Sequence, residues 1–165
     1  VIESSVGSFG EFGHWTMETD KSHQCHCGEA GCLETIASLW SLLPELRKNF
    51  PEVPSDETSF AAFLKSNDVM QLPVMRKAVD TFALALSNLN KAFYADRIVL
   101  TGPFLEDPAI LAQLETGFFQ RLPDYARGKC HMYVAQRGAL DLTQGCAMPF
   151  FEERMRNVFT SHGKN

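Results

Sequence analysis

Three of the five cysteines in this 165-residue chain lie within eight residues of one another, at Cys25, Cys27 and Cys32. Thiolates supply most of the ligands in closed structural zinc sites, which hold the ion with four nitrogen or sulfur donors. Gly28 and Gly31 lie among the cysteines and would let the backbone turn tightly enough for three sulfurs to converge. The cluster therefore predicts zinc as a structural cofactor.

A fourth ligand must come from a nearby histidine, and His14, His23 and His26 are the candidates. His26 lies between two proposed ligands, where the geometry would be strained, and His23 precedes Cys25 by only two residues. His14 is better separated. The predicted metal ligands are therefore His14, Cys25, Cys27 and Cys32. The simpler alternatives are buried reduced thiols, which a polar loop disfavours, and a disulfide, which a cytoplasmic setting disfavours.

Four protein ligands leave no open coordination position, so the zinc would be structural rather than hydrolytic. Its task would be to order the polar stretch from His14 to Cys32, which is long for a segment with little regular structure. Glu11 and Glu34 lie at the two ends of this stretch. These two carboxylates are the first candidates for a functional role.

Two motifs surround the cluster: Gly10-Glu11-Phe12-Gly13-His14, and Cys-x-Cys-Gly-x-x-Gly-Cys-Leu-Glu from Cys25 to Glu34. Together they resemble the paired signature of the ROK family, which contains bacterial transcriptional repressors and sugar kinases. The resemblance implies an α/β fold, an actin-like or ribonuclease-H-like lobe with a small mixed sheet, several helices and a zinc-bound loop. It also implies that residues 1–165 are the C-terminal lobe of a longer protein, which agrees with a start at Val1 rather than Met.

In that family the Glu and His of the first motif, and the Glu that ends the second, lie against sugar hydroxyls. The resemblance thus implies sugar contacts for Glu11, His14 and Glu34. Carboxylates accept hydrogen bonds from hydroxyls, and a site built to do so rejects analogues that lack the partner. His14 would bind zinc through one ring nitrogen while its other face touches the sugar. Without the motifs, Glu11 would be a solvated loop carboxylate, and Glu34 an N-terminal helix residue favoured by the helix dipole.

The turn Gly102-Pro103 bears on the choice between the two branches of the family. Kinases of the family tend to carry a Gly-Gly turn there, whereas proline has no N–H to offer a phosphate. The segment from Cys32 to Ser38 also resembles the repressors more closely. In a kinase of the family, the phosphate-binding motif and the catalytic aspartate belong to the N-terminal half, which this sequence does not contain. We therefore predict no catalytic residue here, and we do not expect this chain alone to be an enzyme.

We therefore predict the sugar-sensing effector and oligomerisation domain of a ROK transcriptional regulator. Its effector would be a small sugar or sugar phosphate, and its assembly a homo-oligomer. DNA would be bound only through an absent N-terminal domain, because a formal charge of -5 with scattered basic residues argues against nucleic-acid binding by this segment. Two alternatives remain open: the C-terminal half of a ROK sugar kinase that phosphorylates a hexose or amino sugar with ATP, and a bare interaction domain whose sugar pocket has decayed.

The overall composition, 45% apolar and 21% charged, is typical of one folded globular domain. No apolar run approaches the roughly 20 residues that a membrane span needs. The first residues also lack the basic and apolar regions of a signal peptide. We therefore expect a cytoplasmic protein with no membrane partner.

Hydrophobic periodicity predicts the elements that must position the two motifs. We expect an edge strand over residues 1–12, a buried strand over 97–103 and another strand over 131–134. Expected helices cover residues 34–50, 75–93 and 139–159, the last interrupted near Pro149. Two more begin at capping residues, one at Ser55 or Asp56 and one at Asp107 or Pro108, the latter running to Leu122. Cys130 and Cys146 are expected to be small buried apolar residues.

Overall fold

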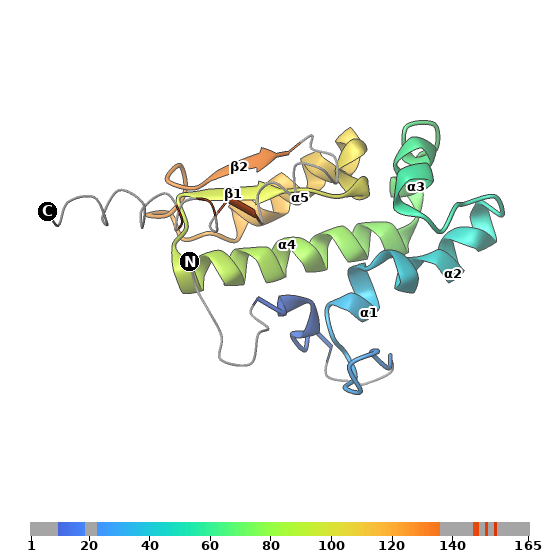
Figure 1. Ribbon diagram of the computed structural model, residues 1–165, viewed down its shortest axis with the longest axis horizontal. Coiled ribbons are helices and arrows are strands. Elements are labelled where there is room, and N and C mark those ends of the chain that lie inside the picture. The colour runs from blue at the N-terminus through green and yellow to red at the C-terminus, as the bar shows by residue number, and fades with distance from the viewer. Residues whose placement is uncertain (1–9, 19–22, 136–146, 149–150, 152–153, 155–165) are drawn as a thin grey trace, which may run out of the picture. The chain divides into compact units, whose positions relative to one another are not determined.

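The computed structural model describes residues 10–18 and 23–135, together with residues 147, 148, 151 and 154 (Figure 1). The chain forms two compact units, residues 1–133 and residues 134–165, and the site lies in the first. The predicted strand over residues 1–9, most of the predicted helix over 139–159, and Cys146 lie outside the described residues. At the end of the predicted edge strand, the chain instead forms a short 3-10 helix, η1, Phe12–His14.

Helix α4, Pro73–Phe93, runs through the middle of the first unit (Figure 1). Proline suits its first position because the ring presets φ and no N–H is needed there. Met75, Val79 and Leu86 recur at helical spacing and are buried. The helix ends at Tyr94, which adopts a left-handed conformation with φ of 48°. The predicted long helix is confirmed.

The predicted helix over residues 34–50 is two helices, α1, Glu34–Ala37, and α2, Leu39–Asn49. They are separated by Ser38, whose backbone is extended and whose Oγ accepts a hydrogen bond from the Ser41 N–H at 3.4 Å. Serine competes with the helix by bonding nearby backbone groups, so it begins a new helix more readily than it continues one. The prediction of one continuous helix was wrong for this reason.

Helix α3, Glu57–Leu64, begins at the predicted capping residue Asp56. The Asp56 Oδ1 accepts a hydrogen bond from the Ser59 N–H at 2.9 Å, and this bond lowers the pKa of the Asp56 carboxyl. Phe60 is fully buried on the inner face of the helix. A 3-10 helix, η2, Val69–Gln71, leads from α3 into α4.

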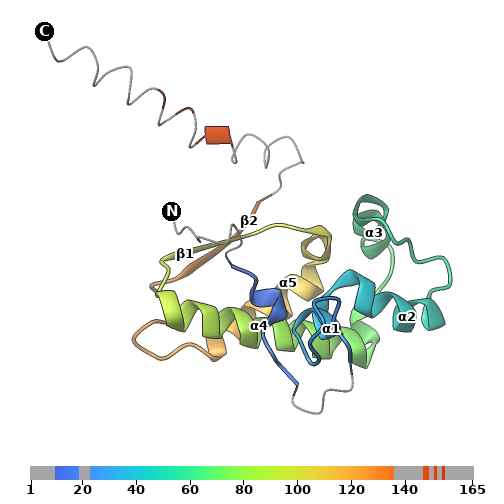
Figure 2. The same cartoon turned by 60° about the horizontal axis from the view of Figure 1, so that its bottom comes forward.

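Strands β1, Arg97–Leu100, and β2, His131–Val134, form a two-stranded parallel sheet (Figure 2). The connection between them contains η3, Pro103–Glu106, and α5, Pro108–Gln120, so the unit is β-α-β. Helix α5 is capped by Asp107, as predicted. Among the described residues the sheet is parallel, which differs from the predicted mixed sheet.

The two faces of β1 differ in burial. Ile98 and Leu100 pack against the cluster that includes Phe118 and Leu122 of the α5 region. On the other face Val99 is 59% exposed, so the prediction of a buried strand was wrong. A short apolar run does not reveal whether both faces of its strand are covered. In the described part of the chain, only one face of this sheet is covered by helices.

Two apolar clusters hold the first unit together. The larger joins α2, α3, α4 and α5 around fully buried side chains such as Phe60 and Met75. The smaller joins α4, α5 and the sheet around Phe118, and it contains Cys130, which is buried as predicted. None of the described helices is long and apolar enough to cross a membrane.

Candidate metal centre

The four predicted metal ligands come together in the segment of residues 10–33, called the metal loop below, of which residues 19–22 are not described. The four ligands are His14, Cys25, Cys27 and Cys32, and their donor atoms all lie within 4.8 Å of one another. Cys27 Sγ is 3.7 Å from Cys32 Sγ, and Cys25 Sγ is 3.6 Å from His14 Nδ1. Tetrahedral zinc with Zn–S near 2.3 Å and Zn–N near 2.0 Å has edges of about 3.8 Å between sulfurs and about 3.5 Å between sulfur and nitrogen. These two distances match those edges, so the donor set could hold a tetrahedral metal ion.

Backbone pairing brings the ends of the metal loop together. Thr16 and Cys32 form an antiparallel bridge, and the Leu33 N–H donates to the Trp15 carbonyl at 2.9 Å. Gly31 has φ of 75°, and a Cβ there would overlap the carbonyl oxygen of Glu18. Only glycine fits this position, as the predicted tight folding around the cysteines requires.

The other two histidines make different contacts. His23 Nδ1 lies 3.2 Å from Glu18 Oε2, and the His26 ring stacks on Trp40 of α2 with the centroids 4.2 Å apart. A disulfide would need sulfurs about 2.05 Å apart, and the described cysteines are free. The structure thus favours His14 among the three candidates, while the role of these residues as metal ligands stays a prediction.

The electrostatics of the sulfur cluster favour a cation. Cys25 is 3% exposed and Cys32 is fully buried. Burial, reinforced by the neighbouring sulfurs, raises the pKa of Cys32 to about 12, whereas the backbone of Glu29 lowers the pKa of Cys27. Three adjacent thiolates therefore cannot form here at neutral pH unless a positive ion compensates them. A divalent metal ion held by these residues would supply that charge.

The three predicted sugar contacts gather around η1. Glu11 directly precedes η1, and its Oε2 lies 4.0 Å from His14 Nε2, while His14 Nδ1 faces the sulfurs. Glu34, the first residue of α1, packs against Gly13, where an added Cβ would come within 2.9 Å of the Glu34 Oε1. The site can thus present two carboxylates and one imidazole edge to a ligand rich in hydroxyl groups.

A cavity of about 670 Å³ opens beside this group. Its lining includes Glu11 and Trp15 of the metal loop together with Leu89, Phe93 and Arg97. His14 and Glu34 are not among its lining residues. The cavity therefore reaches only one of the three predicted sugar contacts.

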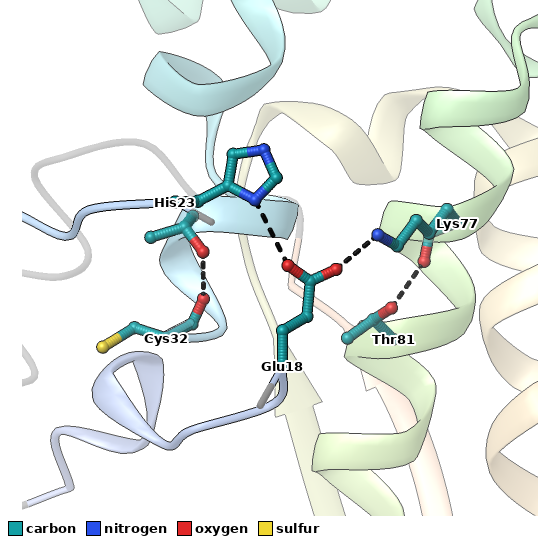
Figure 3. A network of polar contacts seen from close by, with 6 residues as sticks. Glu18, His23, Cys32, Lys77 and Thr81 are labelled. Atoms are coloured by element: carbon teal, nitrogen blue, oxygen red, sulfur yellow. Dashed lines mark hydrogen bonds and ion pairs between the residues drawn. The ribbon is translucent and has the colours of Figure 1, made fainter. Parts of the chain in front are cut away.

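Sequence reasoning missed one contact of the metal loop, the ion pair between Glu18 and Lys77 of α4 (Figure 3). The Glu18 carboxylate lies between Lys77 and His23 in this view. The partners are 59 residues apart, and neither belongs to a motif. No signal in a single sequence would have identified the pair.

The family model of the ROK family matches residues 1–150. The chain belongs to the ROK family. Over 118 residues it is 27% identical to a glucokinase of Halalkalibacterium halodurans, which covers 62% of this chain and 35% of that protein. Over 127 residues it is 27% identical to an N-acetyl-D-glucosamine kinase of Escherichia coli, covering 69% of this chain and 39% of that protein. The chain thus spans well under half the length of these relatives.

Solved structures of both branches share the fold. A ROK family transcriptional regulator, described as a homolog of the E. coli MLC protein, matches with a TM-score of 0.60 at 19% identity, over 78% of this chain and 35% of that one. The ROK hexokinase of Thermus thermophilus matches with a TM-score of 0.64 at 24% identity, over 84% and 46%. These matches establish an α/β lobe of the ROK type, and both regulators and kinases carry it.

Proposed function

We propose that this chain is the C-terminal, sugar-sensing and oligomerisation lobe of a ROK transcriptional regulator, and that the metal loop holds a structural zinc ion. The observation that carries the proposal is the convergence of His14 and three cysteines, with Glu11 near His14 and Glu34 against the neighbouring Gly13. A closed four-ligand site has no position for substrate, so the ion would act by fixing the carboxylates. Its ligands would be His14, Cys25, Cys27 and Cys32.

The sugar would be bound by Glu11, His14 and Glu34. Carboxylate oxygens accept hydrogen bonds from sugar hydroxyls, and bonds to charged groups are stronger than neutral ones. A zinc ion on His14 Nδ1 would fix the tautomer, leaving the Nε2 proton to donate. The names of the curated relatives suggest D-glucose and N-acetyl-D-glucosamine as the first sugars to test.

The turn after β1 supports the regulator over the kinase. Gly102 has φ of 137°, and Pro103 begins η3 directly after it. Proline leaves this turn without one of the N–H groups that a phosphate cradle would use. The next residue, Phe104, packs edge-on against Phe60 with the ring centroids 5.0 Å apart, so the turn also contributes a side chain to the apolar core.

Sugar binding would favour one of two conformations of the regulator. This change in their populations would alter the geometry of the DNA-binding part upstream.

The second candidate is the C-terminal half of a ROK sugar kinase. Two curated relatives at 27% identity are kinases, which favours this alternative. In open α/β folds, ligands bind outside the carboxyl ends of the strands, and a cavity of about 140 Å³ lined by Thr101 and Gly102 lies at that end of β1. Small-molecule pockets usually measure about 300–1,000 Å³, so this cavity alone is too small for a nucleotide.

Calorimetry on the full-length protein tests the sugar site. D-glucose and N-acetyl-D-glucosamine should be titrated into the wild type and into Glu11→Ala, with Glu45→Ala as a matched control. Glu45 is an exposed glutamate of α2 that pairs with Lys48. Loss of one charged hydrogen bond weakens binding by about 1.5–3 kcal/mol, roughly ten- to a hundredfold. Equal affinity in wild type and Glu11→Ala would reject the sugar contact.

A coupled assay for ADP release decides between regulator and kinase. The full-length protein is incubated with ATP, Mg²⁺ and the sugar that binds. We expect sugar binding without turnover. Sugar-dependent ADP release at rates typical of enzymes, about 1–1,000 per second, would establish the kinase instead.

A further inference from the structure

The four metal ligands can determine the shape of the metal loop, but they cannot determine where the loop lies on the rest of the protein. All four ligands, from His14 to Cys32, belong to the loop itself. An ion bound to them would fix their mutual distances and nothing else. Contacts between the loop and the helices must therefore set where the loop, and with it the sugar site, lies on the protein.

The ion pair between Glu18 and Lys77 is one such contact (Figure 3). The Glu18 side chain is only 16% exposed, whereas that of Lys77 is 58% exposed. The Glu18 carboxylate also lies 3.2 Å from His23 Nδ1, so it joins both branches of the loop to α4. A partly buried carboxylate is held more firmly by such a pair than a fully exposed one would be.

Backbone hydrogen bonds connect Glu18 to the sugar site. The N–H groups of Met17 and Glu18 both donate to the Gly31 carbonyl, at 2.7 and 3.1 Å, and the Leu33 N–H donates to the Trp15 carbonyl. These bonds form a short antiparallel ladder. One end of the ladder is Glu18 with Gly31, and the other end leads directly into His14 and Glu34. A shift of the first end therefore moves the second.

Helix α4 also holds the other end of this ladder. Phe12 of η1 contacts Phe82 with ring centroids 6.4 Å apart. Lys77 and Phe82 are five residues apart, about 7.5 Å along a helix. Two contacts at separate points on one rigid helix fix the angle of the loop as well as its position.

We propose that Lys77 is a positioning residue for the sugar site: through Glu18 it fixes the metal loop on α4 and so sets the positions of Glu11 and His14 relative to Glu34 of α1. The inference rests on the proposed sugar binding and adds a residue that does not touch the sugar. Its effect should appear in sugar affinity and not in metal content. A 1 Å displacement of positioned groups is enough to cost much of their interaction.

The test measures sugar affinity, zinc content and melting temperature of the full-length protein for Lys77→Ala, Lys77→Arg and the charge swap Glu18→Lys with Lys77→Glu. We expect Lys77→Ala to weaken sugar binding roughly two- to fivefold, the range of a surface ion pair. Zinc content and melting temperature should stay at wild-type values. Lys77→Arg and the swap should recover most of the affinity.

Lys48→Ala is the matched control, since it removes an exposed lysine from a pair within α2. It should leave sugar affinity unchanged. Wild-type affinity in Lys77→Ala would overturn the positioning role while leaving the sugar site intact. A wild type that binds neither sugar would instead reject the proposed function, and the positioning role with it.

Amide hydrogen exchange gives a second readout that needs no sugar. In Lys77→Ala, the Met17 and Glu18 amides, which donate to the Gly31 carbonyl, and the Gly31 amide, which donates to the His23 carbonyl, should exchange faster, because this end of the loop has lost one of its contacts with α4. The amides of α4 itself should keep their protection. Unchanged exchange in the ladder would also overturn the inference.

Discussion

The metal loop and the helical body of residues 34–133 are stabilised by different interactions. Among the described residues of the loop, only Cys25, Cys32 and Leu33 are buried apolar side chains. The body instead has two clusters built on side chains such as Phe60 and Phe118. Apolar burial can hold the body together by itself. The loop needs a few strong, specific interactions, so it should be separable from the body by removing them.

Removal of the metal should produce the largest difference between the two regions. We expect about one zinc per chain by elemental analysis, and none after Cys27→Ser with Cys32→Ser. Apparent zinc binding in small folded sites is worth about 10–16 kcal/mol, so the loop should lose its structure. Amide exchange should accelerate at Met17 and Leu33, whose N–H groups are bonded within the loop, while α4 stays protected.

Cys130→Ser is the control for the double variant, since Cys130 lies in the smaller apolar cluster of the body. It should keep a full equivalent of zinc. A reduced, metal-free protein whose loop amides are as protected as in the wild type would show that the loop is ordered without an ion.

Truncation of the core should have the opposite pattern. Phe118 is fully buried beneath the sheet, and Phe118→Ala should lower the free energy of unfolding by about 3–5 kcal/mol. Zinc content of the folded protein should not change. Urea denaturation followed by circular dichroism measures the loss of unfolding free energy. Phe119 is a partly buried neighbour, and Phe119→Ala should have a smaller effect. Equal effects of the two variants would mean that Phe118 is not the packing centre.

The two regions were also predictable to different degrees. In the body, periodic apolar residues identified α4, and capping residues located the starts of α3 and α5. Ser38 was missed because its break depends on a local hydrogen bond. The exposed face of Val99 was missed because a short apolar run does not say what covers it. The second error concerns the tertiary surroundings of the strand, which hydrophobic periodicity and residue propensity do not contain.

In the metal loop, the chemistry of the ligands predicted the site, whereas hydrophobic periodicity gave no signal. The cysteine spacing and the better separation of His14 identified the four donor atoms that the structure brings within 4.8 Å. The contact that places the loop on the body was invisible, because Glu18 and Lys77 are 59 residues apart and individually ordinary. Metal ligands carry a recognisable spacing, whereas a single long-range ion pair does not.

A smaller effect is expected at the start of α5, within the body. Asp107 is buried, and its Oδ1 accepts hydrogen bonds from the Ala109 and Ile110 N–H groups at 2.7 and 3.4 Å. Asp107→Ala should cost about 0.5–2 kcal/mol, because these helix N–H groups lose their partner. Asp107→Asn keeps an acceptor and should cost less. Thermal unfolding checks this, and equal losses for both variants would show that the charge rather than the cap matters.

The smallest expected effect is a change of stability in acid. Low pH should act on the body through carboxyl groups such as that of Asp56, and on the metal loop through its metal ligands. The hydrogen bond from the Ser59 N–H lowers the pKa of Asp56 in the folded protein, below the unfolded value of about 3.9. Stabilisation by a carboxylate of this kind is complete above the unfolded pKa and is lost as the pH falls through the folded pKa. Asp56→Asn keeps a capping acceptor but cannot ionise. The wild type should therefore melt slightly higher than Asp56→Asn at pH 7, and the difference should disappear near pH 2. Loss of the proposed zinc ion in acid would affect both proteins equally, because Asp56 lies outside the metal loop. A difference in melting temperature that is constant from pH 7 to pH 2 would show that the Asp56 charge contributes nothing to α3.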